Sequence, residues 1–164
     1  MDSVEHCGVR VSLCERVYAP SDDTFLLCDA LKTVSGKRCL ELGCGTGLAA
    51  VMLAKNRNEV WASDINPHAV ECCRRNALEN GVKVRAVQAD LFPGRCGRFD
   101  VVAFNPPYLP TGDGDRTDEW TDAATDGGSD GLAVTRRFLA GLPKHLAADG
   151  EAYLVVSYPY RYRL

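Results

Sequence analysis

Short apolar runs alternate with segments of helical periodicity along most of the chain. Residues 9–13 are expected to form a short leading strand, and five further runs have the composition of buried strands, at residues 38–42, 59–65, 84–90, 99–104 and 151–156. Repeated alternation of strand and helix is typical of a parallel sheet with helices on both faces. The pattern therefore predicts an α/β fold of the Rossmann-like kind.

Capping signals define four helices between these strands. Ser21 and Asn66 carry side-chain oxygens that can accept from first-turn N–H groups, and Pro67 suits a first helical position. Gly81 suits the left-handed residue that ends a helix, and Pro143 is expected to break the last one. The expected helices cover residues 22–34, 48–54, 67–80 and 132–142.

Residues 109–129 show no helix or strand pattern and are rich in Gly, Asp and Thr. A loop of this length inside a compact domain is usually functional or mobile. Acidic residues outnumber the single Arg116 across residues 111–130. Such a charge run is usually just solvated, but beside a binding site it would repel a phosphate backbone. Trp120, an aromatic residue of this loop, suits a cover over a site or an anchor for a substrate.

Size and charge are ordinary for one soluble domain. The chain has 164 residues, a net charge of -3 and a pI of about 5.6, so it lacks the basic surface expected of a protein that grips nucleic acid by itself. It shows neither an apolar leader nor a run long enough to cross a membrane. These features predict a cytoplasmic protein, with the nucleus as a second compartment open to it.

The eight cysteines show no metal-binding pattern. They form no C-x-x-C pair, and neither they nor the three histidines have the spacing of a zinc site. Reduced, mostly structural thiols are therefore expected, and no metal ligand is predicted.

A glycine turn, Gly43-Cys44-Gly45-Thr46-Gly47, separates a strand from the helix that follows it. Glycine allows the backbone to approach a ligand at a helix N-terminus. Asp64, followed by Ile65, ends the next strand, where its carboxylate could accept from both hydroxyls of a ribose. Asp90, beside Leu91, ends the third strand, where its carboxylate could accept from the exocyclic amine of an adenine. Each feature singly could be a structural turn or a strand-end cap, and a dinucleotide fold uses a similar turn. Together they predict a nucleoside cofactor.

The run Asn105-Pro106-Pro107-Tyr108 directly follows the strand at 99–104. Two prolines end the strand at the edge where open α/β sheets bind ligands. The amide oxygen of Asn105 and the carbonyl of Pro106 can each accept one N–H, and Tyr108 can stack on a plane. The motif thus suits binding of a planar NH2 group. The alternative is that it forms a rigid turn at the strand end and takes no part in any reaction.

The acidic strand end, the glycine turn and the Asn-Pro-Pro-Tyr run together resemble the class I S-adenosylmethionine-dependent methyltransferases that act on planar NH2 nitrogens. Glu41, Gly43, Gly45 and Gly47 carry the first part of the resemblance. The motif at 105–108 is shared by adenine-N6 DNA methyltransferases, some guanine-N2 RNA methyltransferases and the glutamine methyltransferases of release factors. By itself it leaves the substrate open.

The segment from Val17 to Leu27, with Tyr18, Pro20, Asp23 and Thr24, is similar to the opening signature of eukaryotic and archaeal HemK-like release-factor glutamine methyltransferases. The resemblance covers nearly the whole chain and implies one methyltransferase domain over residues 1–164. It implies methylation of the glutamine in the Gly-Gly-Gln motif of a class I release factor. It also implies a small zinc-binding activator subunit docked near the third strand, at residues 84–89, as the sheet edge. The family normally continues beyond the last strand seen here, so the sheet is expected to be short on that side.

The resemblance gives each candidate residue a role. Asn105, Pro106 and Tyr108 are expected to hold the substrate amide. Asp23 and Thr24 are expected at the methionine end of the cofactor or at the substrate mouth, with simple helix-dipole complementation as the alternative. The expected cofactor set is Tyr18, Asp23, Thr24, Glu41, Gly43, Cys44, Gly45, Gly47, Asp64, Ile65, Asp90, Leu91 and Asn105.

Three other functions compete with this one. A methyltransferase of adenine or guanine NH2 groups in DNA or RNA would need a basic groove, which the acidic loop argues against. A non-catalytic cofactor-binding subunit would not need an intact motif at 105–108. A dinucleotide-dependent oxidoreductase would leave that motif unexplained.

Overall fold

Five parallel strands form the central sheet of the computed structural model, which describes residues 2–110 and 119–156. The strand order is β5-β4-β3-β6-β7. The strands are β3 (Arg38–Leu42), β4 (Glu59–Asp64), β5 (Val84–Gln88), β6 (Phe99–Phe104) and β7 (Leu146–Leu154). The order in which successive strands are added to the sheet reverses between β3 and β6. Ligands of open α/β sheets bind at such a topological switch point. The expected parallel α/β fold, with the third predicted core strand at the sheet edge, is confirmed.

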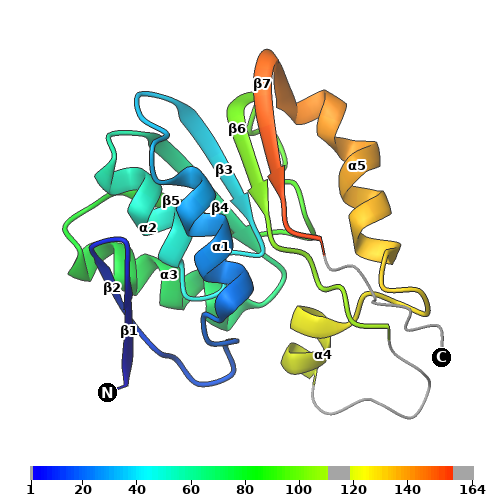
Figure 1. The fold of residues 1–164 in the computed structure, drawn as a ribbon, viewed down its shortest axis with the longest axis horizontal. Helices are drawn as coiled ribbons and strands as arrows, with labels where there is room; N and C mark the ends of the chain where they lie inside the picture. Colours follow the sequence, from blue (N-terminus) through cyan, green and yellow to red (C-terminus); the bar gives the residue numbers. More distant parts are fainter. Residues whose placement is uncertain (1, 111–118, 157–164) are drawn as a thin grey trace, which may run out of the picture.

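Helices cover both faces of the sheet, and each face has its own apolar core. The bounds of the four main helices are α1 (Asp22–Leu31), α2 (Leu48–Lys55), α3 (Pro67–Glu79) and α5 (Ala133–His145). Figure 1 shows α1, α2 and α3 on one side of the sheet and α5 on the other. The first core joins helices α1 to α3 to inward residues such as Val60 and Val101. The second packs Phe138 of α5 against Leu40 and Phe104. Alternate residues along β3 and β6 thus face opposite cores, as the period of a strand requires.

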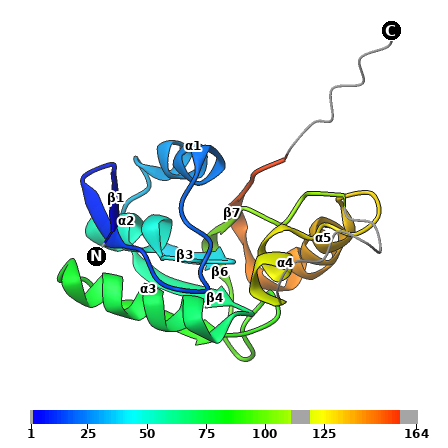
Figure 2. The ribbon, with the colours of Figure 1, turned by 90° about the horizontal axis from the view of Figure 1, so that it is seen from below.

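An N-terminal hairpin packs beside α2 and α3. Antiparallel strands β1 (Ser3–His6) and β2 (Val9–Ser12) form it, and Figure 2 shows it at the end of the molecule opposite α5. The fully buried Asn76 accepts from Ser12 N at 2.9 Å and donates to Ser12 O at 3.1 Å and Thr46 O at 2.8 Å. One amide therefore ties the hairpin to the glycine turn. The strand at 9–13 was expected, but its partner β1 was not.

The largest differences from the expected boundaries are at α1, α5 and β7. Helix α5 continues through Pro143 to His145, and β7 begins at Leu146. Pro143 lies in the last turn, so its missing N–H removes one hydrogen bond only at the end of the helix. Arg98 donates to the carbonyls of Pro143 and Leu146 at 3.0 and 2.6 Å and so satisfies acceptors at that end. Helix α1 ends at Leu31 instead of residue 34.

Part of the long loop at 109–129 is helical. Helix α4 (Glu119–Thr125) lies within it, and Leu109 forms a bridge with Asp126 beyond that helix. Three of the seven acidic residues of the run, Asp113, Asp115 and Asp118, lie outside the described residues, as do residues 157–164. None of the described helices is both long and apolar enough to span a membrane.

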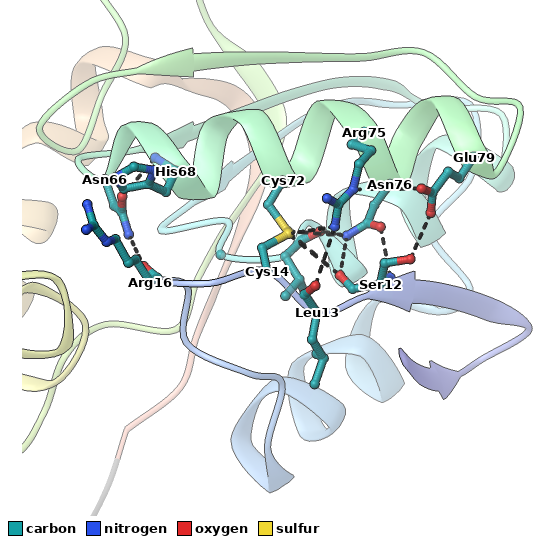
Figure 3. Close-up of a disulfide and its surroundings, with 12 residues drawn as sticks. Ser12, Leu13, Cys14, Arg16, Asn66, His68, Cys72, Arg75, Asn76 and Glu79 are labelled. Atoms are coloured by element: carbon teal, nitrogen blue, oxygen red, sulfur yellow. Dashed lines mark hydrogen bonds and ion pairs between the residues drawn. A yellow bond between two sulfur atoms is a disulfide. The ribbon is translucent and has the colours of Figure 1, made fainter. Parts of the chain in front are cut away.

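The expectation that every cysteine is reduced was wrong for Cys14 and Cys72, which form a disulfide 58 residues apart in sequence. Figure 3 shows the chain after β2 running along α3, with Cys14 directed at Cys72. The other six cysteines are free. Sequence spacing carries no sign of this pair because only the docking of the hairpin segment on α3 brings the two together.

Candidate active site

A cavity of about 490 Å³ opens at the carboxyl ends of β3, β4 and β6. Its wall takes residues from the glycine turn, from the segment between β2 and α1, and from α4 and α5. Cavities of this size are typical of small-molecule and cofactor sites. The location agrees with the switch point of the sheet.

The glycine turn shapes the floor of this cavity. Gly43, Gly45 and Gly47 all have positive φ, at 62°, 51° and 82°. Side chains of L-residues rarely tolerate that conformation. A Cβ on Gly47 would also lie 2.6 Å from Cys73 Sγ and 3.0 Å from Cys73 Cα. This glycine is therefore required both by backbone conformation and by the packing of α3 on the start of α2.

Asp64 joins the turn to the next strand. Its Oδ2 accepts from Gly45 N and its Oδ1 from Asn66 N, each at 2.9 Å. Burial raises the pKa of Asp64, and the hydrogen bonds from backbone N–H groups oppose that rise. The carboxylate lines the cavity with lone pairs that remain free for hydroxyl donors.

Glu41 lies deeper, at the end of β3. It is 4% exposed, and its Oε2 accepts from Ala50 N in the first turn of α2 at 2.8 Å. Burial raises the pKa of Glu41 to about 8, against the effect of the Ala50 bond. Its carboxyl group therefore holds α2 against β3 beneath the glycine turn.

Asp90 is held by a residue that sequence reasoning missed. The guanidinium of Arg137, on α5, lies 2.6 Å from Asp90 Oδ2, and both side chains are about half exposed. Both residues line the cavity, next to Leu91. The nearby ring of Phe92 stacks on Phe138 at 5.8 Å between centroids. This corner of the cavity combines a fixed carboxylate with apolar surface.

The motif after β6 presents one open acceptor. Asn105 lines the cavity, and its Oδ1 is buried without a hydrogen-bond partner among the described residues. Buried polar atoms nearly always have a partner, so an orphan in a cavity wall points to a missing ligand group. Tyr108 turns its hydroxyl to Asp23, donating to Oδ2 at 3.0 Å. Its hydroxyl is therefore held by the protein itself.

The cavity brings together most of the expected cofactor residues. Those that line it are Tyr18, Thr24, Glu41, Gly43, Cys44, Gly45, Asp64, Ile65, Asp90, Leu91 and Asn105. Asp23, Gly47, Pro106 and Tyr108 are not part of the wall, whereas Pro107 is. Their expected roles stay predictions.

Helices α4 and α5 add wall residues outside the expected cofactor set. Trp120, Ala123 and Ala124 come from α4, and Val134 and Arg137 from α5. Among them, only Trp120 has a signal in the sequence, as a loop aromatic suited to cover a site. The others carry no local signal, because only the docking of α4 and α5 across the strand ends makes them part of the site.

Comparison with known proteins agrees with this geometry. The methyltransferase small domain family matches residues 21–121. A Methanocaldococcus jannaschii protein, whose name assigns it as a protein N5-glutamine methyltransferase, is 39% identical over 155 residues, covering 94% of this chain and 79% of that protein. The eRF1 methyltransferase catalytic subunit mtq2 of Schizosaccharomyces pombe is 33% identical over 174 residues, covering 90% and 75%.

The fold is also shared with solved structures. A methyltransferase from Pyrococcus furiosus superposes with a TM-score of 0.70 at 24% identity, covering 92% of this chain and 70% of that one. At 24% identity this similarity shows only that the fold is shared. With the family match and the two relatives, it shows that this chain belongs to the HemK-like class I methyltransferases, which use S-adenosylmethionine.

Proposed function

We propose that this protein transfers a methyl group from S-adenosylmethionine to the side-chain amide nitrogen of the glutamine in the Gly-Gly-Gln motif of a class I release factor. The names of its relatives support this substrate. The observation that carries the proposal is the open Oδ1 of Asn105, a buried acceptor in the cavity wall. A planar NH2 group is what such an acceptor would bind.

The residues of the cavity fit the cofactor. Asp64 offers carboxylate lone pairs to ribose hydroxyls, and Asp90 offers them to an exocyclic amine beside Leu91. The glycine turn leaves its backbone open for close approach to a ligand. The bound cofactor would supply an electrophilic sulfonium methyl group. We place Tyr18 and Thr24, both in the cavity wall, at the end where that group would lie.

The amide nitrogen is a poor nucleophile because its lone pair is delocalised into the carbonyl. The protein must therefore orient the nitrogen and favour its rehybridised form. Asn105 Oδ1 and the Pro106 carbonyl each accept one N–H of the substrate, and both bonds strengthen as positive charge develops on nitrogen. The methylated nitrogen then loses a proton readily, so no dedicated base is needed.

The charge of the cavity wall favours a protein over a nucleic acid. Asp64, Asp90 and Asp126 line it, and Arg137, the one arginine among the described wall residues, is paired with Asp90. A phosphate backbone would meet mostly carboxylates there. Methylation of an exocyclic amine in DNA or RNA is the rival outcome of the test below.

We also propose that a small zinc-binding activator subunit docks along β5. This strand pairs only with β4 among the described strands, so one row of its backbone groups is available for strand addition. Co-expression with the activator should raise yield and activity over the chain expressed by itself. A well-behaved, fully active monomer would refute this docking.

Transfer of labelled methyl from S-adenosylmethionine to a release factor tests the proposed function. The wild-type factor should be labelled, more strongly with the activator than without it, and a Gln-to-Asn change in Gly-Gly-Gln should abolish labelling. Labelling of that mutant at the wild-type level would refute the glutamine assignment. An adenine-containing oligonucleotide, offered in parallel, tests the nucleobase alternative.

Asn105→Ala provides the matching test on the enzyme. It removes the open acceptor without touching the contacts of Asp64 or Asp90, so transfer should be lost while cofactor binding measured by calorimetry is retained. If cofactor binding disappears as well, the role given to Asn105 is wrong.

A further inference from the structure

Asp23 links the start of α1 to the motif that follows β6. Its Oδ2 accepts from the Tyr108 hydroxyl at 3.0 Å, although the two residues lie 85 positions apart. Its Oδ1 accepts from Thr24 N at 2.7 Å and from the Ser21 hydroxyl. The carboxylate is thus fixed from the helix side and presents its other oxygen to the motif.

The Asn105 side chain also interacts with this carboxylate and is among the groups whose hydrogen bonding lowers the pKa of Asp23. Burial raises the pKa of Asp23, but hydrogen bonds from Ser21, Asn105, Thr24 and Tyr108 outweigh it and hold that pKa below its ordinary value. The group is therefore ionised at neutral pH and has no proton to donate. Asn105 must act as the donor through Nδ2, because an ionised carboxylate only accepts.

That bond decides which end of the amide faces the substrate. With Nδ2 turned to Asp23, Oδ1 of Asn105 is left as the orphaned acceptor in the cavity wall. A flipped amide would set the N–H groups of Asn105 against those of the substrate. The alternative role, in which Asp23 only complements the dipole of α1, does not account for its interactions with Asn105 and Tyr108.

We propose that Asp23 is a positioning residue, which holds the Tyr108 ring and orients the Asn105 amide so that its oxygen, and not its nitrogen, receives the substrate NH2 group. The inference rests on the proposed function for the identity of that group. It departs from the expectation that Asp23 contacts the cofactor. It gives α1 a part in catalysis through a carboxylate that is not part of the cavity wall.

The first test needs no substrate. Burial, the hydrogen bond to Asp23 and the charge of Asp23 raise the pKa of Tyr108, in that order. In protein labelled with 13C on the tyrosine ring, NMR titration should show the Tyr108 pKa falling toward its ordinary value in Asp23→Asn. Asp22→Asn, an exposed carboxylate in the same helical turn, is the matched control and should leave that pKa unchanged. Tyr108→Phe identifies the signal.

The second test uses the release factor. Asp23→Ala lets the Asn105 amide rotate, and kcat should fall by about 10- to 100-fold, the usual cost of misplaced catalytic groups. Asp23→Asn should keep more activity than Asp23→Ala. The oxygen of the new amide can still accept from Asn105 Nδ2, and in that arrangement Oδ1 of Asn105 stays free for the substrate. Affinity for S-adenosylmethionine and thermal stability should stay close to wild type in Asp23→Asn, and Asp22→Asn should match wild type throughout.

Each contrary result is decisive. An unchanged Tyr108 pKa in Asp23→Asn, or a wild-type kcat in Asp23→Ala, would overturn the positioning role. Cofactor affinity that falls in step with kcat would make Asp23 a cofactor ligand instead. If the wild-type enzyme labels no release factor, the proposed function fails, and the same kcat comparison on the oligonucleotide then decides the role of Asp23.

Discussion

The guanidinium of Arg137 lies 2.6 Å from the carboxylate of Asp90, joining α5 to the strand end after β5. The pair is half exposed, so it adds little to folding stability, but it fixes one oxygen of Asp90, a residue of the cavity wall. Arg137→Gln should therefore weaken S-adenosylmethionine binding by about two- to fivefold, corresponding to a weak exposed pair, with little change in Tm. Arg136→Gln, a neighbour paired with Asp130, is the control for calorimetry and should bind normally. Equal affinity in the two variants would remove Arg137 from the site.

Asp64→Ala should weaken cofactor affinity by about 10- to 100-fold, since hydrogen bonds to charged groups contribute about 1.5–3 kcal/mol. The change removes the acceptor of Gly45 N and Asn66 N as well as the proposed ribose ligand. Asp64→Asn, which keeps an acceptor, should lose less. Calorimetric titration measures both, and unchanged affinity in the alanine variant would place the ribose elsewhere.

Glu41 should make stability depend on pH. Its folded-state pKa of about 8 lies above the ordinary value of 4.5, so its contribution to stability is fully present below about pH 4.5 and is lost as pH rises through 8. Glu41→Gln keeps the acceptor for Ala50 N but cannot ionise, so it should gain stability relative to wild type between pH 5 and 8. Urea unfolding across that range measures the effect. Glu71→Gln, which removes an exposed carboxylate, should show the same dependence of unfolding free energy on pH as wild type. If Glu41→Gln also shows that dependence, Glu41 is not the group responsible for it.

Gly47→Ala should destabilise the fold by about 2–4 kcal/mol, from a left-handed conformation together with overpacking. The new Cβ would approach both the side chain and the backbone of Cys73. Gly36→Ala is the control, because Gly36 has φ of 67° but a Cβ added there would have no neighbour within 4 Å. Denaturant unfolding should show the smaller loss for Gly36→Ala. Equal losses would mean that α3 gives way to the added methyl group.

Reduction of the Cys14–Cys72 disulfide should lower the free energy of unfolding by about 2–4 kcal/mol, because the closed loop constrains the unfolded chain. The bond closes a loop between residues 58 positions apart. Urea unfolding with and without dithiothreitol measures the loss. The unfolding free energy of Cys14→Ser should not change when the reductant is added. If that of the wild-type protein does not change either, the disulfide does not contribute to stability.

Local sequence signals placed most of the framework. The bounds of β3 and β6 were predicted as observed, because short, mostly apolar runs between turn residues suit buried parallel strands. The positive-φ glycines and the double proline are backbone constraints that act within a few residues. For the same reason the glycine turn and the motif at 105–108 could be assigned to strand ends from local sequence alone.

The long-range contacts could not be foreseen in this way. The partners of Asp23 and Asp90, the disulfide of Cys14 and the wall residues from α4 and α5 all depend on elements packed from distant parts of the chain. Periodicity reports which face of an element is buried, but not which residue of another element it meets. The sequence by itself therefore determined the parallel α/β fold and the chemistry of its strand ends. Only the tertiary structure brings the Asp23 carboxylate of α1 to the motif after β6, because this contact joins residues 85 positions apart, and only the packed site shows Oδ1 of Asn105 buried without a partner among the described residues.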